Sequence, residues 1–159
     1  RRIVFIDDDS RAFKNTVEEC PSCRYISGAT ELDAFIEELK PELNARLEEP
    51  AAPHEQLLIV IAEFNDFFKT LTDEQAAFMR KVFRYIDSPQ YKICFLCGFD
   101  VNGEKNNDGL FMSLIVNAES YVLCADCYKI ATAKLPLIPE AKSRSCYFCL
   151  EGKTVEIRW

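Results

Sequence analysis

The hydrophobic positions of this chain form short apolar runs that alternate with amphipathic stretches. The clearest run, Leu57–Ile61, is wholly apolar and rich in β-branched residues, which predicts a central strand buried on both faces of a parallel sheet. Further apolar runs predict strands at Ile3–Ile6, Tyr25–Ile26, Ile93–Leu96 and Tyr121–Leu123. Because amphipathic stretches separate the first four runs, the pattern indicates an α/β fold.

Two of these amphipathic stretches carry helix start signals. Thr30 with Asp33 and Thr72 with Gln75 have the spacing of capping boxes, so each threonine is expected to begin a helix. The inward stripe expected for the first helix is Leu32, Phe35, Ile36, Leu39 and Leu43. The stripe expected for the second is Phe78, Val82, Phe83 and Ile86. Pro41 should kink or divide the first helix because it lacks a backbone N–H.

The end of the chain has a different pattern. Tyr147–Leu150 and Thr154–Ile157 flank Glu151-Gly152-Lys153, which predicts a C-terminal β-hairpin. Before it, Val101–Asp108 is expected to be a loop and Leu110–Val116 a short helix. The chain of 159 residues is predicted to be one domain. It opens Arg-Arg-Ile without a methionine, so a fragment of a larger multi-domain protein is expected.

Charge and hydropathy exclude two classes of function. The net charge of −7, with basic residues scattered among acidic ones, argues against a nucleic-acid surface, which needs clustered Lys and Arg. No apolar run approaches the length of a membrane span. The only histidine, His54, lies between prolines in a predicted loop, so a Ser-His-Asp triad is not expected.

The residues that follow the Leu57–Ile61 run are the first candidate site. Ligands of α/β proteins bind at the carboxyl ends of parallel strands, and a P-loop hydrolase has an aspartate there that helps to hold Mg²⁺. Here the two positions are Ala62 and Glu63, so the run resembles a Walker B strand that has lost its metal residue. The alternative is an ordinary buried strand that ends near a glutamate. The sequence contains no G-x-x-x-x-G-K-[ST] loop to bind phosphates.

A second acidic group follows the first predicted strand. Asp7–Asp9 could bind Mg²⁺ and is similar to the acidic pair of a response-regulator receiver. A receiver also needs an aspartate at the end of a later strand, where this chain has Ala62. A solvated strand end is the simpler interpretation of this run.

The cysteines offer a rival interpretation. All eight fall in C-x-x-C pairs, and two such pairs in one chain are typical of Zn²⁺ held by four thiolates. If zinc binds, Cys94, Cys97, Cys124 and Cys127 are the expected ligands. Geometry argues against it, because residues three apart in a strand point to opposite faces, and both Cys94 and the Cys146–Cys149 pair lie in predicted strands. Buried cysteines that pack as small hydrophobes are therefore the alternative.

Taken in order, the segments resemble one protein family across most of the chain. The segments are Arg2–Asp8, Tyr25–Ser27, Glu31–Arg46, Leu57–Phe68, Ile93–Gly98, Leu135–Leu137 and Tyr147–Trp159. They are similar to the C-terminal ATPase-like domain of the FtsK/SpoIIIE-type membrane ATPase of type VII secretion, the EssC/YukB group. The resemblance implies a RecA-like, P-loop NTPase-like parallel sheet that here lacks the Walker A strand.

The resemblance also implies a function. Its parent proteins are membrane-anchored bacterial ATPases that use ATP and Mg²⁺, and their last cytoplasmic domains are often degenerate. This chain is then a non-catalytic module that binds the C-terminal signal of a secreted WXG100-type protein or a neighbouring ATPase domain. Phe64, Phe67 and Phe68 are its candidate docking residues, because aromatic residues dominate interfaces. The alternative is that these rings belong to the core. A zinc-stabilised interaction domain is the rival function.

The missing Walker A strand makes the order of the sheet a specific prediction. Leu57–Ile61 is expected between Ile3–Ile6 and Ile93–Leu96. Tyr121–Leu123 is then expected on the far side of Ile93–Leu96, where it would cover that edge.

Overall fold

The computed structural model describes residues 1–7, 11–83, 89–98, 120–124, 145–150 and 153–158. The chain divides into two compact units, Arg1–Phe99 and Asp100–Trp159, and each is described by itself. That the two form one domain stays a prediction. The predicted loop at 101–108 and the predicted helix at 110–116 lie outside the described residues.

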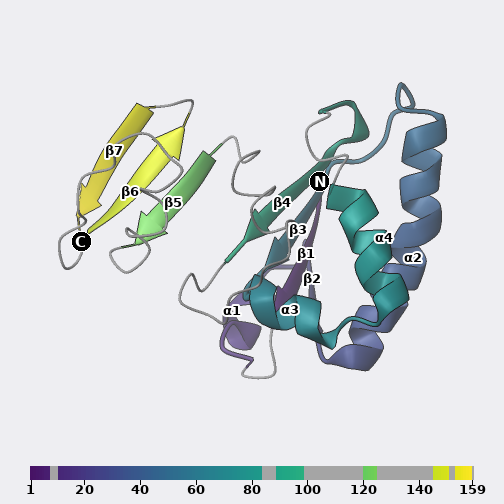
Figure 1. The fold of residues 1–159 in the computed structure, drawn as a ribbon, viewed down its shortest axis with the longest axis horizontal. Coiled ribbons are helices and arrows are strands. Elements are labelled where there is room, and N and C mark those ends of the chain that lie inside the picture. The colour runs from purple at the N-terminus through teal and green to yellow at the C-terminus, as the bar shows by residue number, and fades with distance from the viewer. Residues whose placement is uncertain (8–10, 84–88, 99–119, 125–144, 151–152, 159) are drawn as a thin grey trace. The chain divides into compact units, whose positions relative to one another are not determined.

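The first unit is built on a four-stranded parallel sheet (Figure 1). Its strands are β1 (Arg2–Asp7), β2 (Cys23–Ser27), β3 (Leu57–Ile61) and β4 (Ile93–Cys97). The order β2-β1-β3-β4 confirms that β3 lies between β1 and β4. The helical elements are α1 (Lys14–Glu18), α2 (Ala29–Glu48), α3 (Phe64–Thr70), α4 (Asp73–Phe83) and the 3₁₀ turn η1 (Pro89–Tyr91). The α/β fold class is confirmed.

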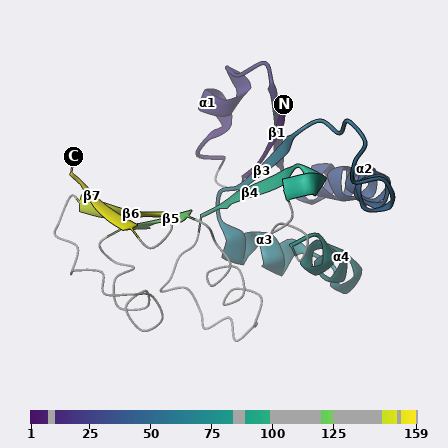
Figure 2. The ribbon, with the colours of Figure 1, turned by 90° about the horizontal axis from the view of Figure 1, so that it is seen from above.

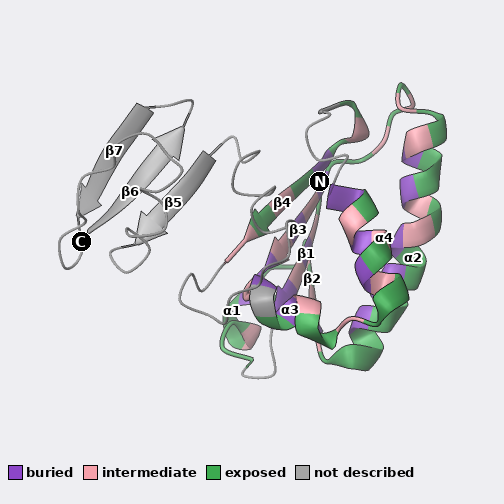
Figure 3. Ribbon diagram, in the orientation of Figure 1, coloured by how far each residue is buried: buried purple, intermediate pink, exposed green. Residues whose placement is uncertain are grey.

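One face of this sheet is the main core of the unit. Val4 and Ile6 of β1 and the alternate residues Leu57, Ile59 and Ile61 of β3 are buried. The helices α2, α3 and α4 cover this face: Arg24 of β2 pairs with Glu38 of α2, and the Phe83 ring of α4 lies 4.6 Å from the Phe95 ring of β4. The predicted stripe of α2 is buried throughout (Figure 3).

The other face of the sheet corrects a prediction. Burial alternates along β3, with Leu58 and Val60 only half-buried, so this strand is not buried on both faces. Figure 2 shows α1 on this side of the sheet, and α3 and α4 on the opposite side. Since α1 is a single short helix, it cannot cover all four strands as the helices on the first face do.

The two helix starts predicted from threonines have different outcomes. The Thr72 capping box is confirmed, because the Thr72 N–H donates to Gln75 Oε1 at 2.8 Å and the Gln75 N–H to Thr72 Oγ1 at 3.3 Å. The Thr30 start is wrong, since α2 begins at Ala29 with Gly28 as its N-cap. Gly28 has φ +92°, a conformation that only glycine adopts readily, and this ends β2 sharply enough to begin the helix early.

Two details of the helices differ from the predicted pattern. The helix α2 continues through Pro41 to Glu48, so the proline does not divide it. Pro41 is exposed, so water can donate a hydrogen bond to the carbonyl of the preceding turn, which lacks the N–H donor that another residue at this position would supply. In α4, Val82 and Phe83 are buried as predicted, whereas Phe78 is only half-buried and Met79, which the predicted stripe left out, is fully buried. Ile86 lies outside the described residues.

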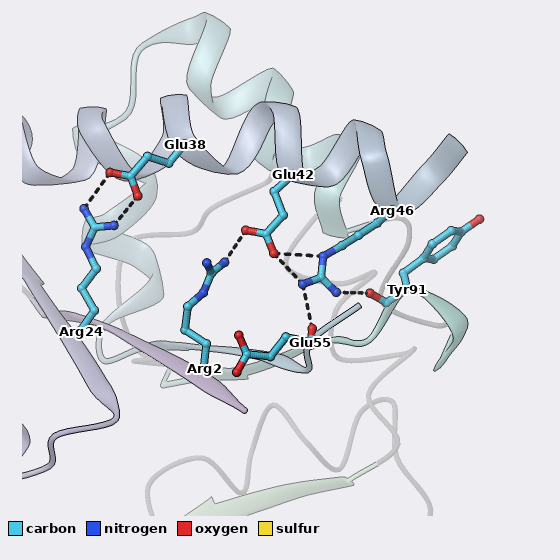
Figure 4. Close-up of polar contacts among 7 residues, drawn as sticks. All are labelled: Arg2, Arg24, Glu38, Glu42, Arg46, Glu55 and Tyr91. Atoms are coloured by element: carbon cyan, nitrogen blue, oxygen red, sulfur yellow. Dashed lines mark hydrogen bonds and ion pairs between the residues drawn. The ribbon is translucent and has the colours of Figure 1, made fainter. Parts of the chain in front are cut away.

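A buried arginine ties three segments together at the amino edge of the sheet. Arg46 of α2 is 2% exposed and donates to the carbonyl oxygens of Tyr91 at 2.7 Å and Glu55 at 2.8 Å (Figure 4). Its guanidinium also pairs with Glu42, which accepts a further hydrogen bond from Arg2. Arg46 therefore joins the end of α2 to the residues that precede β3 and β4.

The second unit is a three-stranded antiparallel sheet of order β5-β6-β7. Its strands are β5 (Ser120–Cys124), β6 (Ser145–Leu150) and β7 (Lys153–Arg158). Strands β6 and β7 confirm the C-terminal hairpin. The prediction that Tyr121–Leu123 joins the parallel sheet next to β4 is wrong, because β5 belongs to a separate sheet, in which it pairs with β6. Within the described residues, no helix combines the length and the apolar character needed to cross a membrane.

Candidate functional site

The carboxyl edge of the parallel sheet places Asp7, from one candidate site, beside Ala62, from the other. Strands β1 and β3 are neighbours, with Ile6 and Ile61 as register partners, so Asp7 and Ala62 follow at the same edge. The Ala62 N–H donates to the Ile6 carbonyl at 2.9 Å. The chain leaves β1 toward β2 on one side, while β3 and β4 lie on the other. In open α/β sheets ligands bind at such a switch point.

The chemistry at the end of β3 is limited by Ala62. Its methyl group cannot accept a hydrogen bond from a metal-bound water, so the position cannot hold Mg²⁺ as the Walker B aspartate does. Glu63 follows directly and is half-buried. The end of β3 therefore has a carboxylate that could orient water, but no carboxylate at the position of the Walker B aspartate.

Backbone contacts close the same edge between β3 and β4. The Gly98 N–H donates to the Ile61 carbonyl and the Phe64 N–H donates to the Gly98 carbonyl, each at 2.9 Å. A Cβ atom at position 98 would lie 2.2 Å from the Ala62 carbonyl oxygen, so only glycine fits. The Phe64 N–H begins α3 and is therefore occupied by protein rather than available to a phosphate group.

Asp7 holds neighbouring elements in place. It is buried and its Oδ2 accepts hydrogen bonds from the Tyr25 hydroxyl at 2.8 Å and the Phe13 N–H at 3.1 Å. Burial and the Asp7 carboxylate raise the pKa of Tyr25 to about 12, so the hydroxyl remains a donor. Asp7 therefore fixes the start of α1 against β2. Asp8 and Asp9 lie outside the described residues, and Mg²⁺ binding by this run stays a prediction.

The three candidate docking phenylalanines lie mostly inside the unit. Phe64 and Phe67 are 4% and 6% exposed, and Phe68 is half-buried. The Phe64 ring lies 4.8 Å from the Phe68 ring and 5.6 Å from the Phe83 ring of α4. These contacts favour the alternative that Phe64 and Phe67 are core residues that hold α3 and α4 on the sheet.

The apolar side chains that do reach the surface lie on the opposite side of the sheet. Leu96 of β4 is 61% exposed and Phe13 beside α1 is 48% exposed. We define the α1 face as the exposed or half-buried residues Ile3, Phe5, Leu58, Val60, Cys94 and Leu96. Strand register puts them in two rows across β1, β3 and β4. Sequence analysis missed this face because the apolar run of β3 gives no sign of which side a helix will cover.

The structure separates the two cysteines of the Cys94 pair. Both lie in β4, where Cys94 belongs to the exposed α1 face and Cys97 to the helix-covered face. Burial raises the pKa of the Cys97 thiol to about 12, which disfavours the thiolate that a zinc ligand must be. Within residues 1–98, leaving aside 8–10 and 84–88, no group of three or more His, Cys, Asp or Glu side chains gathers. Cys94 and Cys97 do not fit a shared zinc.

A different pair of cysteines is brought together in the second unit. Cys124 at the end of β5 is the register partner of Cys146 in β6, so one cysteine from each of the last two C-x-x-C pairs meets across the sheet. The sequence carried a signal for this pairing, because 18 residues separate Cys127 from Cys146, within the usual spacing of two zinc knuckles. Our sequence analysis paired Cys124 with Cys97 instead. Cys127 lies outside the described residues.

Comparison with known proteins identifies the fold. No family model and no curated protein matches this sequence. Among solved structures, the cytoplasmic domain of EssC matches with a TM-score of 0.65, 13% identity and 99% of this chain covered. ATPases 2 and 3 of EssC from Geobacillus thermodenitrificans match with a TM-score of 0.68, 16% identity and 99% covered. The chain spans 33% and 30% of those two chains. Its fold is that of an EssC-type ATPase domain.

Proposed function

We propose that this chain is a non-catalytic, ATPase-like module of a type VII secretion motor of the FtsK/SpoIIIE type. The observation that carries the proposal is the match of almost the whole chain to the ATPase domains of EssC, combined with Ala62 at the end of β3. A module with this fold and no metal residue acts by binding. Its parent would be an ATP- and Mg²⁺-dependent protein anchored in a bacterial membrane, with this part in the cytoplasm.

The proposed binding surface is the α1 face, and its proposed occupant is a neighbouring ATPase domain of the same motor. The face is apolar and spans adjacent strands, with Leu96 its most exposed large side chain. An apolar surface of this kind suits another globular domain, because interface cores are apolar and depleted of charge. One matching structure contains two ATPase domains in sequence, so this fold occurs beside another ATPase domain.

The test is binding of the whole chain to the other ATPase domains of the motor from the same organism, measured by calorimetry. Leu96→Asp puts a charge in the proposed interface, and we expect the affinity to fall at least about tenfold. Ala34→Asp is the matched control, since Ala34 is exposed on α2. Circular dichroism checks that both variants fold.

Two outcomes would contradict this docking. One is an absence of saturable binding by the folded wild-type chain, and the other is an equal loss of affinity in Leu96→Asp and Ala34→Asp. Titration with the C-terminal signal peptide of a secreted WXG100-type protein tests the alternative partner. Saturable peptide binding without domain binding would assign the module to substrate recognition instead.

A zinc-stabilised interaction domain is the second candidate, and the register of β5 and β6 favours it. Cys124 and Cys146 lie opposite each other on neighbouring strands. Two ligands of one tetrahedral zinc site must lie close together, and this register brings the two residues near each other. Bound zinc would supply folding free energy to the small second unit. Zinc content of the chelator-washed chain tests it: one retained zinc that Cys146→Ser removes supports the site, and a folded chain without zinc rejects it.

A further inference from the structure

The turn that joins α1 to β2 begins and ends with a cysteine. In Cys20-Pro21-Ser22-Cys23, the Cys23 N–H donates to the Cys20 carbonyl at 3.0 Å, which closes a four-residue turn. The first and fourth Cα atoms of such a turn lie within about 7 Å. Disulfides need Cα atoms about 4.4 to 6.8 Å apart. The Ile3 N–H donates to the Ser22 carbonyl at 3.4 Å and holds the turn against β1.

The two thiols of this turn differ in access and in acidity. Cys20 is exposed, and its Sγ lies 3.4 Å from Ser22 Oγ. Hydrogen bonds from Ser22 lower the pKa of Cys20 and so favour its thiolate. Cys23 is half-buried, and burial together with the nearby Cys20 raises its pKa. An exposed, more acidic cysteine beside a shielded one is the arrangement of an attacking and a resolving thiol.

We propose that Cys20 and Cys23 form a thiol–disulfide exchange site that reduces small-molecule disulfides. The Cys20 thiolate attacks one sulfur of the external disulfide, forms a mixed disulfide and releases the other sulfur as a thiolate. Cys23, as its thiolate, then attacks Cys20 Sγ, which forms the Cys20–Cys23 disulfide and releases the second external thiolate. The two external thiolates take up the protons lost by the two cysteines, so two protein thiols are oxidised as one disulfide is reduced.

Cys94 provides an internal control for this site. It is also exposed, but Cys97 lies on the opposite side of β4 and cannot resolve a mixed disulfide there. Exposure alone would therefore give a stable adduct at Cys94. Resolution at Cys20 requires the geometry of the turn.

The experiment treats the whole reduced chain with oxidised glutathione and follows the tryptic peptide Asn15–Arg24, which contains both cysteines. We expect the wild-type peptide to lose two hydrogens without retaining glutathione, and Cys23→Ser to keep the adduct on Cys20. Cys20→Ser should slow the reaction of this peptide on the order of tenfold, because the more acidic thiol is lost. Cys94→Ser should leave the peptide unchanged.

A second measurement tests the role of the serine. The pH profile of Cys20 alkylation should move toward higher pH in Ser22→Ala, because the hydrogen bond that favours the thiolate is removed. A stable glutathione adduct on the wild-type peptide, in the same yield as in Cys23→Ser, would overturn the proposal. Reaction of Cys20→Ser at the wild-type rate would also overturn it.

Discussion

At the level of single residues, Arg46 is the most deeply buried charged side chain in the described part of the chain. Its guanidinium is almost fully buried and bonds two backbone carbonyls and Glu42. Removing one member of a buried pair leaves the partner charge unpaired, which costs far more than loss of an exposed pair. The helix pattern gave no reason to expect a charged residue among the buried positions of α2.

Replacement of Arg46 by alanine should therefore strongly destabilise the protein. We expect the free energy of unfolding to fall by about 3–5 kcal/mol, because Glu42 and two carbonyls lose their partner. Urea denaturation measures it. The control is Glu38→Gln, which breaks the exposed pair with Arg24 and should cost less than about 1 kcal/mol. Similar losses of unfolding free energy in the two variants would show that the buried contacts of Arg46 stabilise the protein no more than an exposed ion pair does.

The same cluster makes stability depend on pH. Burial alone would raise the pKa of Glu42, but hydrogen bonds from Arg46 and Arg2 outweigh it and hold the pKa below its usual value of 4.5. The unfolded chain then binds the proton first as pH falls. The stabilisation is present above pH 4.5 and is lost as pH falls through the folded pKa.

Comparison of the wild type with Glu42→Gln measures this contribution. We expect the wild type to lose more free energy of unfolding than the variant between neutral pH and a pH below 4.5. Parallel stability curves over that range would refute a lowered pKa of Glu42.

At the level of elements, the two threonines predicted as helix caps have different roles. Thr72 caps α4 in a reciprocal hydrogen-bonded pair with Gln75, whereas Thr30 lies inside the first turn of α2. A cap signal is local and requires only four residues, so Thr72 could be recognised from the sequence. The start of α2 depends on where β2 ends, and β2 is positioned by β1.

The two threonines provide a matched pair of substitutions. Thr72→Ala should lower the free energy of unfolding by about 1 kcal/mol, because the Gln75 N–H loses its acceptor. Thr30→Ala should change it by less than about 0.5 kcal/mol, since alanine is the better helix former at an exposed helical position. Thermal unfolding under identical conditions measures both. Equal effects would mean that the Thr72 cap adds nothing.

At the level of the whole molecule, the chain has the fold of an ATPase domain without the residues that ATP hydrolysis needs. The chain has the fold of an EssC-type ATPase domain, yet Ala62 occupies the metal position and Gly98 closes the edge beside it. Nucleotide hydrolysis needs a phosphate cradle as well as a metal residue, and the sequence contains no Walker A motif.

Restoring the metal residue alone should therefore not create an ATPase. We expect Ala62→Asp to release phosphate from ATP and Mg²⁺ no faster than the wild-type chain, and both to match a protein-free blank. Ala62 is half-buried at the end of a strand, so the aspartate can be accommodated. Magnesium-dependent turnover in the wild-type chain would contradict the non-catalytic function, and turnover in the variant alone would show that only the metal residue was missing.

The sequence by itself determined the features that short stretches of chain specify. Apolar runs specified β1, β3 and β4, the Thr72 box specified the start of α4, and Ala62 left the Walker B position without a carboxylate. The C-terminal hairpin followed for the same reason, because only two residues separate its two strands in the chain. These features depend on neighbours within a few residues.

Only the tertiary structure decided which surfaces meet. It paired β5 with β6, set Cys124 opposite Cys146, buried Arg46 and left the α1 face with exposed Leu96. Each outcome depends on contacts between residues far apart in the chain, and an apolar side chain in a strand has the same sequence signal whether or not a helix covers it. The sequence therefore predicted the strands of the parallel sheet, while folding determined which of their side chains are exposed.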